Sequence, residues 1–413
     1  MFFRLALKSL INRKGSVALT ILAMSVSIFV LLGVEHIRTQ TKQSFNSTVS
    51  GVDLIVGART GSLNLLLYSV FRIGSPTNNI DWQAYQTIAN HAKVAWAIPI
   101  SLGDSHKGYR VMGTSTDYFK HFSYGNKHQL TFTKGKPFSD LFDVVLGSEV
   151  ATKLGYSLGD KIVLAHGLGE TSFSLHDDKP FKISGILAAT GTPVDQTVHV
   201  SLQGIEAIHL DWQQGVRVPG RTITNEQLES LALQPKNITA FMLGLNSRMA
   251  TFRVQRDINN YHKEPLTAIL PGVALSELWQ MMGLMENTLR LISGLILTAA
   301  LLGLSAMMLA SIREREHEIH LLRVIGAPPI FLFLLIEMEA LLISLLSILL
   351  AISALSLSLI SSSGFLVSNF GLHIGHSLLS GNNLLFILII IGATFVAAAL
   401  PSFLAYKNAK SDR

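Results

Sequence analysis

The chain has 413 residues, of which 49% are hydrophobic and 15% charged, and its mean hydropathy is +0.40. This composition is too apolar for an ordinary soluble protein and too charged in its middle for a compact bundle of membrane spans, so we expect a membrane protein with one large aqueous domain. The net charge of +6 does not indicate nucleic-acid binding, because the basic residues are dispersed and many flank apolar segments. The chain has no cysteine, which excludes disulfides and thiolate metal sites.

The N-terminal region predicts a first membrane span. Basic residues among the first 14 precede an uncharged run over residues 15–34, which at about 1.5 Å per residue is long enough to cross roughly 30 Å of hydrocarbon. The run is longer than the apolar part of a signal peptide and lacks a small-x-small cleavage pattern, so we interpret it as a retained anchor. Helix-compatible polar residues at 35–44 predict that the helix continues as a stalk.

The middle of the chain, residues 49–271, predicts a mixed α/β domain. Short apolar segments alternate there with Gly, Pro, Asn and Asp. We expect helices over residues 81–91, 148–154 and 249–261. We expect strands over residues 52–56, 94–100, 109–113, 144–146, 161–165, 181–187, 197–202 and 237–245. No internal repeat or linker is evident, so one domain and two packed subdomains both remain open.

The C-terminal third predicts three further spans. An amphipathic, Met-rich segment at 275–288 leads into the apolar run 291–310, and two more apolar runs follow at 330–360 and 384–400. Four spans place both termini on one side of the membrane. The basic residues near both ends make that side the cytoplasm, so the α/β domain lies outside.

These elements predict a multi-pass α-helical membrane protein with four transmembrane helices and a large mixed α/β domain inserted between helices 1 and 2, which is periplasmic if the cell envelope has two membranes. We divide the chain into an N-terminal segment with the first span and stalk (1–48), the periplasmic domain (49–271), a second stalk and span (272–311), a cytoplasmic helix that the family resemblance given below implies to be a coupling helix (312–329), the third span (330–360), a short periplasmic loop (361–383), and the fourth span with a cytoplasmic tail (384–413).

Two features of the spans suggest how they pack. Ala299, Gly303, Ala306 and Ala310 recur at steps of four, three and four residues, which predicts a face that another helix can approach closely. Glu337 and Glu339 interrupt the third span, where carboxylates are costly, so we expect them to face other helices or the membrane interface. Being two residues apart on a helix, they point to nearly opposite sides, which argues against a paired acid site or an ion path.

Residues 311–329 are the densest cluster of charge in this apolar region. Charges of mixed sign over 313–318 are followed by an apolar residue at every third position over 319–325, which predicts a short amphipathic helix. Gly326 ends this helix, and the two prolines that follow Ala327 prevent a simple continuation. A solvated loop helix and a docking surface are both compatible with the charge pattern.

Histidines and carboxylates concentrate in one part of the expected external domain. They are His166, His176, Asp177, Asp178, Asp195, His199 and His209. Neutral imidazoles and carboxylates suit zinc, but the spacing matches no tight ligand motif and the chain has 14 histidines. We therefore assign no metal site and retain His166, His176 and His199 as candidate ligands.

Motifs for enzymatic chemistry are missing from the sequence. There is no GxxxxGK[ST] phosphate-binding loop, and GxSxG, HExxH and GxGxxG are absent as well. We therefore expect a non-catalytic chain that binds no cofactor of its own.

The order of parts resembles the MacB/FtsX-like permeases, the membrane subunits of type VII ABC transporters, over essentially the whole chain. In that family a helix with the pattern R-x-x-E-I-x-x-L-R-x-x-G-A connects spans two and three and docks on the ATPase. The matching positions are Arg315, Glu318, Ile319, Leu322, Arg323, Gly326 and Ala327, with Arg313 just before them. Residues 336–347, which include Glu339, resemble the start of the family's third span. Residues 400–413 resemble its last-span ending, with Ser402 in place of the usual alanine.

The resemblance implies a homodimer or heterodimer of four-span subunits in a bacterial inner membrane, working with two copies of a separate ATPase that binds ATP and Mg. ATP hydrolysis would move the periplasmic domains through the stalks, by mechanotransmission, and so drive export or extraction of an envelope substrate with a further periplasmic or lipoprotein partner. The alternative is an FtsX-like signal transducer that controls a periplasmic partner such as a cell-wall hydrolase. An ion-coupled transporter is disfavoured, because four spans without inverted repeats do not fit one.

Overall fold

The computed structural model describes residues 2–167, 176–210, 212–213, 216–217, 233–314, 324, 327–370 and 381–411. The chain divides into two units, each of which is described by itself. The helical unit comprises Met1–Thr41, Met282–Gly364 and Ile374–Arg413. The α/β unit comprises Lys42–Met281 and Phe365–His373.

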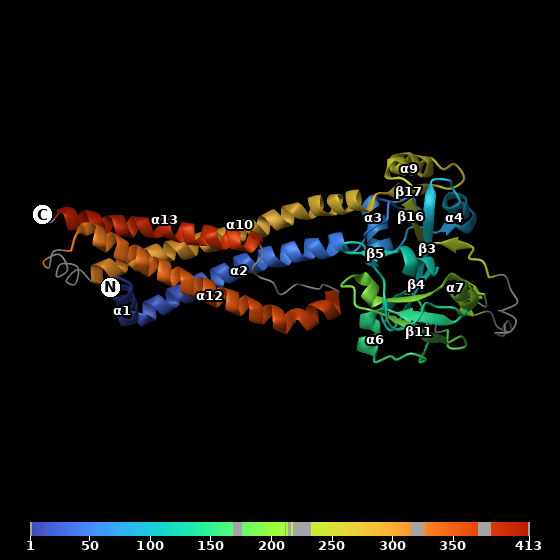
Figure 1. The fold of residues 1–413 in the computed structure, drawn as a ribbon, viewed down its shortest axis with the longest axis horizontal. Coiled ribbons are helices and arrows are strands. Elements are labelled where there is room, and N and C mark those ends of the chain that lie inside the picture. Colours follow the sequence, from blue (N-terminus) through green and yellow to red (C-terminus); the bar gives the residue numbers. More distant parts are fainter. Residues whose placement is uncertain are drawn as a thin grey trace. The chain divides into compact units, whose positions relative to one another are not determined.

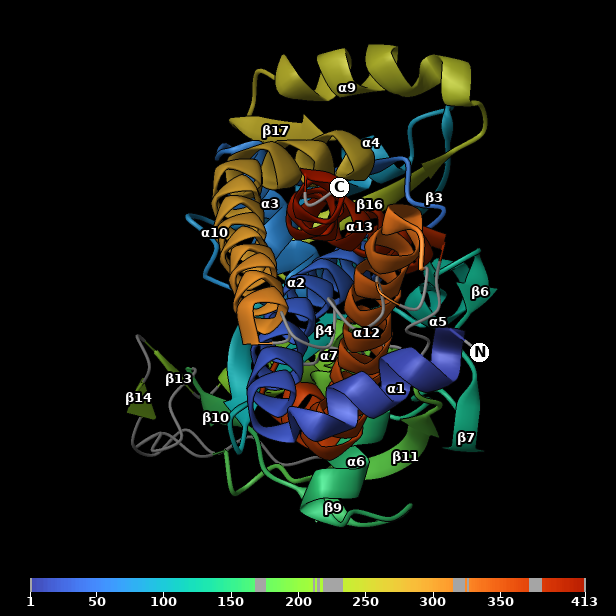
Figure 2. The ribbon, with the colours of Figure 1, turned by 90° about the vertical axis from the view of Figure 1, so that its left-hand side faces the viewer.

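Long helices make up the helical unit. They are α1 (Phe2–Asn12), α2 (Lys14–Ser47), α10 (Pro271–Glu314), α12 (Pro329–Phe370) and α13 (Gly381–Ser411). Among the described residues, four helices are long and apolar enough to cross a membrane, within α2, α10, α12 and α13. The four predicted spans are confirmed. Figure 1 shows these four helices running along one another, and in Figure 2 they are viewed closer to end-on, with α1 crossing the view.

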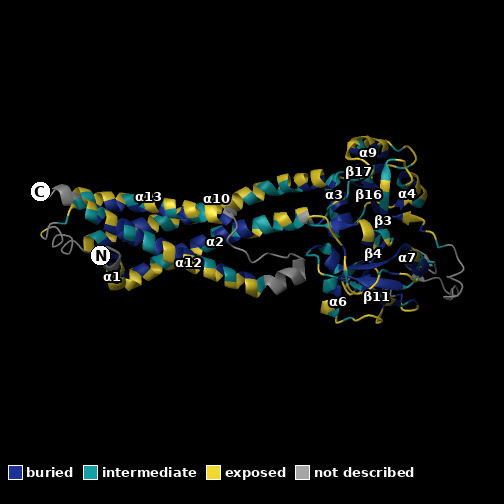
Figure 3. Cartoon of the chain, viewed as in Figure 1, coloured by how far each residue is buried: buried dark blue, intermediate teal, exposed yellow. Residues whose placement is uncertain are grey.

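The spanning helices pack through apolar side chains joined by a few polar contacts. Met24, Leu304 and Ile343 belong to one buried cluster, and a second cluster lies around Ile28 and Ile390. Polar bonds link the same helices, because the Ser305 hydroxyl donates to the Ala397 carbonyl and the Thr394 hydroxyl donates to the Ser344 hydroxyl oxygen. Such packing suits lipid, where close fit and hydrogen bonds drive association. The remaining helix faces expose apolar side chains (Figure 3).

All four spanning helices are longer than a bilayer requires, and the two that flank the inserted domain are α2 and α10. At about 1.5 Å per residue, the 34 residues of α2 span about 50 Å and the 44 residues of α10 about 65 Å, compared with roughly 30 Å of hydrocarbon. Both therefore have a part that extends beyond the hydrocarbon, as the expected stalks require.

The third span extends further than the sequence predicts. We expect a loop from residue 361, but α12 remains helical to Phe370. The expectation rested on the run of serines that begins at Ser361. In the helix the Ser362 hydroxyl donates to the Ser358 carbonyl, 2.7 Å away, so a serine is accommodated by bonding back to the preceding turn.

The α/β unit is built on an 11-stranded sheet, and the prediction of a mixed domain between the first two spans is confirmed. Its strands run in the order β17-β1-β16-β3-β4-β12-β8-β11-β7, while β10 pairs with β3 and β9 with β11. Most pairs are antiparallel, but β12 pairs with β4 and β11 with β8 in parallel. The strands of this sheet are β1 (Leu54–Ala58), β3 (Val94–His106), β4 (Tyr109–Thr114), β7 (Phe132–Gly135), β8 (Asp143–Leu146), β9 (Lys161–Ile162), β10 (Ala165–His166), β11 (Phe181–Leu187), β12 (Thr197–Ser201), β16 (Ala240–Leu245) and β17 (Leu266–Ile269).

Short pairs and helices complete the unit. The remaining strands are β2 (Ile80–Asp81), β5 (Ser123–Tyr124), β6 (His128–Gln129), β13 (Trp212–Gln213), β14 (Val216–Arg217) and β15 (Asn237–Ile238). The helices are α3 (Ser62–Leu66), η1 (Leu67–Phe71), α4 (Trp82–Ala89), α5 (Asp117–His121), α6 (Ser148–Leu154), η2 (Pro193–Gln196), α7 (Leu202–His209), η3 (Arg248–Ala250) and α9 (Thr251–Asn259).

Most of the predicted elements are present, with two kinds of difference. The strand expected over 94–100 continues to His106 as β3, because strand pairing incorporates a segment whose Gly, Asp and Ser residues have low strand propensity. The strand expected over 161–165 is divided into β9 and β10, and several short elements were not predicted, among them α3, α5, α7, β7 and β17.

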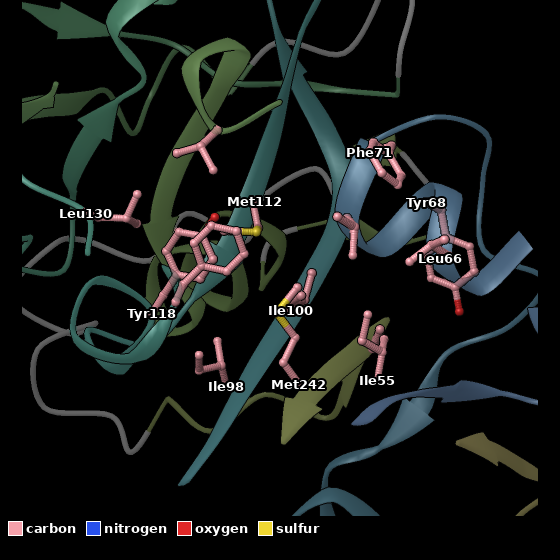
Figure 4. Packing of buried hydrophobic residues seen from close by; sticks show 14 of the residues in the cluster. Ile55, Leu66, Tyr68, Phe71, Ile98, Ile100, Met112, Tyr118, Leu130 and Met242 are labelled. Atoms are coloured by element: carbon pink, nitrogen blue, oxygen red, sulfur yellow. The ribbon is translucent and has the colours of Figure 1, made fainter. Parts of the chain in front are cut away.

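Apolar side chains fill the space on the sheet's faces. Figure 4 shows part of the largest cluster, in which Ile100 of β3 and Met242 of β16 lie beside Ile55 of β1, while the ring of Tyr118 lies against Met112. A rigid sheet packed in this way holds the ends of its strands in fixed positions. One strand end carries the polar cluster described next.

Candidate functional site

Four side chains from separate segments of the α/β unit converge on one point. They are Asp104 of β3, His166 of β10, His176, and His209 at the end of α7. One ligand atom from each lies within 4.8 Å of those from the other three. Asp104 Oδ1 is 3.2 Å from His166 Nδ1 and 3.5 Å from His209 Nε2, and the two imidazole nitrogens are 3.3 Å apart. We call these four residues the histidine cluster.

The sheet positions the first two members. In β10, His166 is the register partner of Asp104 in β3. The pairing of β3 with β4 shifts register between Leu102 and Ser105, as expected for a β-bulge, which re-aims side chains and breaks their alternation. As a result two successive residues of β3 are both buried, with Asp104 only 3% exposed and Ser105 beside it 1% exposed.

The other two members are fixed by hydrogen bonds around α7. His209 places its Nδ1 2.8 Å from the carbonyl oxygen of Ile205, so Nδ1 donates there and Nε2 faces the cluster. The main-chain N–H of His176 donates to the Leu164 carbonyl. Three residues later, the buried ammonium of Lys179 donates to the Ala207 carbonyl in α7. These contacts tie the turn that carries His176 to both β10 and the helix that carries His209.

The protonation states of the cluster are perturbed. Burial opposes ionisation of Asp104, but hydrogen bonds from His166 and His209 outweigh it and lower the pKa of the carboxyl to about 2. Burial lowers the pKa of His176 to about 4, so that ring is neutral at pH 7. For His209, burial is outweighed by the hydrogen bond and charge of Asp104, which raise its pKa. The cluster thus combines an anion with nitrogens that can carry either a proton or a lone pair.

His199 does not belong to this cluster, although the sequence suggested it as a third ligand with His166 and His176. It lies inside β12, fully buried, with its ring 5.4 Å from that of Tyr118 and its Nδ1 3.3 Å from the Val145 carbonyl oxygen. Proximity along the chain does not give proximity in the fold here, because β12 carries His199 away from the cluster. Nothing in the sequence pattern singles out Asp104, and His209 belongs to the wider group of histidines and carboxylates in this part of the chain.

An ionic network joins the two stalk helices in the helical unit. Glu35 of α2 accepts hydrogen bonds from Arg38, at 2.6 and 3.2 Å, and from Arg290 of α10, at 3.2 Å. Arg38 also donates to Glu286 of α10, 3.1 Å away. We call these four residues the stalk network. It holds α2 and α10 to each other by charge-assisted bonds.

The two carboxylates of the third span are both buried, as expected for residues that face other helices. Glu339 is 1% exposed and accepts a hydrogen bond from Arg13, which lies between α1 and α2. Both oxygens of Glu337 are buried, and the hydroxyl of Ser402 is the polar group beside this carboxylate. The two carboxylates therefore do not form an acid pair.

The small residues of the second span lie on an exposed face of α10 among the described residues. Ala299, Gly303, Ala306 and Ala310 are all exposed, and a Cβ added to Gly303 would meet no atom within 4 Å. The buried residues of α10 lie on its other side and include Leu297, Leu304 and Met308. The predicted close-approach face is thus open in the single chain.

Most of the predicted coupling helix lies outside the described residues. Arg315, Glu318, Ile319, Leu322, Arg323 and Gly326 are in this group. Arg313 is exposed in the last turn of α10, and Ala327 precedes α12, which begins at Pro329. Its role in docking remains a prediction from the sequence.

Comparison with known proteins gives two family matches. A model described as the MacB-like periplasmic core domain matches residues 17–259, and one described as the FtsX-like permease C-terminal matches residues 290–411. The chain is similar to the crystal structure of the periplasmic region of MacB from Actinobacillus actinomycetemcomitans, with 10% identity and a TM-score of 0.35 over 56% of this chain and 94% of that one. It is also similar to the extracellular domain of the noncanonic ABC-type transporter YknZ from Gram-positive bacteria, with 10% identity and a TM-score of 0.31 over 53% and 99%. No curated protein matches the sequence.

Proposed function

Because this chain belongs to the MacB/FtsX-like family of ABC transporter permeases, we propose that it couples ATP hydrolysis by a separate ATPase to movement of its α/β domain, and so drives export or extraction of an envelope substrate. The observation that carries this proposal is the combination of two family matches with four apolar helices, which accounts for both the helical unit and the domain inserted between its first two spans. In this proposal the chain holds no nucleotide; ATP and Mg bind to the partner.

The ATPase docks on the segment between the second and third spans. The segment carries the family's charged pattern, and in the sequence it connects α10, described to Glu314, with α12, which begins at Pro329. The residues that we assign to docking are Arg313, Arg315, Glu318, Ile319, Leu322, Arg323, Gly326 and Ala327.

Transmission to the α/β domain uses the stalks. The inserted domain, residues 42–281, is joined to the helical unit at each end by a continuous helix, α2 or α10, rather than by a loop. The stalk network binds these two helices to each other through buried Glu35, which favours movement of the pair as one body.

The functional form is a dimer in which the exposed small-residue face of α10 contacts a helix of the second subunit. Small side chains permit the close backbone approach on which helix association in lipid depends. In this proposal both termini and the docking segment lie in the cytoplasm of a bacterium and the α/β domain lies outside the inner membrane, because basic residues flank the spans at both ends of the chain.

Charge reversal tests the docking site. We expect the full chain to co-purify with an ATPase and to stimulate it, and we expect Glu318→Lys and Arg323→Glu to insert normally but to lose that association, because each reverses a charge on a docking surface. Lys120→Glu is the matched control, since it reverses an exposed charge in the α/β domain. Normal ATPase binding and stimulation by both docking variants would refute the assignment.

Two assays on the assembled complex distinguish the export function from the signalling alternative. Purified full-length complex is supplied with ATP and tested in two assays, release of lipoproteins from vesicles and activation of peptidoglycan hydrolysis. ATP-dependent release supports transport. ATP-dependent hydrolase activation without release would replace it with the signal-transducer alternative.

A further inference from the structure

We propose that Asp104, His166, His176 and His209 form a binding site for one divalent transition-metal ion, with zinc as the best match. This site lies in the α/β unit and is independent of the proposed coupling to an ATPase. Three imidazoles and one carboxylate supply the nitrogen and oxygen donors that zinc accepts, and a chain without cysteine has no thiolate to compete for it.

The distances between donor atoms match a tetrahedral site. Zinc binds imidazole nitrogen and carboxylate oxygen at about 2.0–2.1 Å, which makes the edges of a regular tetrahedron about 3.3–3.4 Å long. The three separations among Asp104 Oδ1, His166 Nδ1 and His209 Nε2 are 3.2, 3.3 and 3.5 Å. These atoms therefore already form one triangular face of such a tetrahedron. His176, within 4.8 Å of the others, supplies the fourth corner after a small movement of its ring.

Contacts behind the ligands are those that a metal site requires. A histidine that binds a metal usually donates its other ring N–H to a carbonyl or carboxylate, which fixes both tautomer and orientation. His209 does so, because its Nδ1 lies 2.8 Å from the Ile205 carbonyl oxygen and leaves Nε2 directed at the cluster. On the other side, the Lys179 ammonium bonds the Ala207 carbonyl and holds the turn of His176 against the same helix.

The cluster is open on one side and closed on the other. The side chain of His166 is 45% exposed and that of His209 29%, whereas Asp104 and His176 are buried. An ion can therefore enter from solvent past His166 and reach a carboxylate shielded from water. This arrangement differs from a surface group of carboxylates, which binds cations weakly because every ligand stays hydrated.

A second explanation of the same contacts is an ion pair between Asp104 and a protonated imidazole, without a metal. The two explanations make different predictions for His176. An ion pair needs only Asp104 with His166 or His209, so loss of His176 would leave it intact. A metal site uses all four residues, so loss of His176 weakens binding.

The experiment uses the full chain, purified in detergent and stripped with a chelator. We expect one equivalent of Zn²⁺ to bind, measured by competition with a chromophoric chelator, with a Kd below about 1 μM. We expect Co²⁺ in place of Zn²⁺ to give the intense visible absorption of tetrahedral coordination. His176→Gln, His209→Gln and Asp104→Asn should each weaken Zn²⁺ binding by at least about tenfold, as loss of a ligand does.

Controls keep the test independent of folding and of the proposed function. His199→Gln, a histidine of the same domain outside the cluster, should bind Zn²⁺ like the unaltered chain. The near-ultraviolet circular dichroism of each variant checks its fold, and Asp104→Asn preserves side-chain size in case a histidine variant unfolds. Either of two results overturns the metal-site proposal. The first is that the unaltered chain binds Zn²⁺ no more tightly than a variant in which His166, His176 and His209 are all replaced by Gln. The second is that His176→Gln binds Zn²⁺ as tightly as the unaltered chain. Neither result bears on ATPase docking.

Discussion

The guanidinium of Arg13 lies 3.0 Å from the carboxylate of Glu339, which joins the junction of α1 and α2 to the third membrane span. Arg13 is 12% exposed and Glu339 1%, so this ion pair is largely shielded from water. A buried pair adds little net stability over an apolar one, but removal of one partner leaves the other as an uncompensated charge. The pair is therefore a strong constraint on which helices can be neighbours.

Loss of either charge of this pair should destabilise the helical unit. We expect Arg13→Ala and Glu339→Ala each to lower the free energy of unfolding by about 3–5 kcal/mol. The double variant Arg13→Glu with Glu339→Arg, which exchanges the two charges, should recover part of the lost stability. Thermal unfolding in detergent measures both. Glu337→Ala is the matched control, because it removes a buried carboxylate that forms no ion pair among the described residues and should destabilise less than Glu339→Ala. Equal effects of Glu337→Ala and Glu339→Ala would contradict the pairing.

The stalk network predicts unequal effects for its two carboxylates. Glu35→Gln weakens the bonds to Arg38 and Arg290 together, whereas Glu286→Gln affects a bond to Arg38 that Glu35 also satisfies. We expect Glu35→Gln to cost a few kcal/mol of stability and to reduce stimulation of the ATPase, and Glu286→Gln to cost about 1 kcal/mol or less. Thermal unfolding and ATPase assays on the same samples check this. Similar behaviour of the two variants would mean that the network does not hold α2 to α10.

The exposed small-residue face predicts where subunits meet. The chain has no cysteine, so single-cysteine variants have no background. We expect Ala299→Cys and Gly303→Cys to cross-link to a second permease subunit in membranes, identified by mass spectrometry as either this chain or a related one. Thr298→Cys is the control, because Thr298 is exposed but lies about 100° around the helix from Ala299 and about 140° from Gly303. Cross-linking from Thr298 alone would place the interface on another face.

His199 predicts a loss of stability in acid. Burial, assisted by the charge of Arg72, lowers its pKa to about 3, and the other titratable group that faces it, Tyr118, stays neutral because burial raises its pKa to about 12. The unfolded chain takes up this proton near pH 6.5 and the folded chain does not. Stability from His199 is therefore complete above about pH 6.5 and falls as the pH drops towards 3.

The measurement is the unfolding free energy of the full chain at several pH values. Between about pH 6 and 4 the unaltered chain should lose about 1.4 kcal/mol per pH unit more than His199→Gln does. His262→Gln is the control, since His262 is exposed and hydrated in both states. Parallel pH profiles for the unaltered chain and His199→Gln would show that His199 is protonated in the fold.

Local pattern determined much of this protein from the sequence alone. Whether a run of apolar residues is long enough to cross a bilayer depends on that run alone and not on the rest of the chain. The four spans, and the presence of a domain between the first two, could therefore be predicted directly. The charged motif from Arg315 to Ala327 is likewise a contiguous pattern that can be compared with a family without a structure.

Contacts between distant segments were decided only by the tertiary structure. Asp104 and His166 are 62 residues apart, and they meet because β10 pairs with β3 in one register, next to a β-bulge that no periodicity predicts. His199, closer to His209 along the chain, was carried away by its strand. In the same way, the small residues of α10 could be assigned to one face from their spacing, but only the packing of Leu304 and Met308 showed that this face is the one left open.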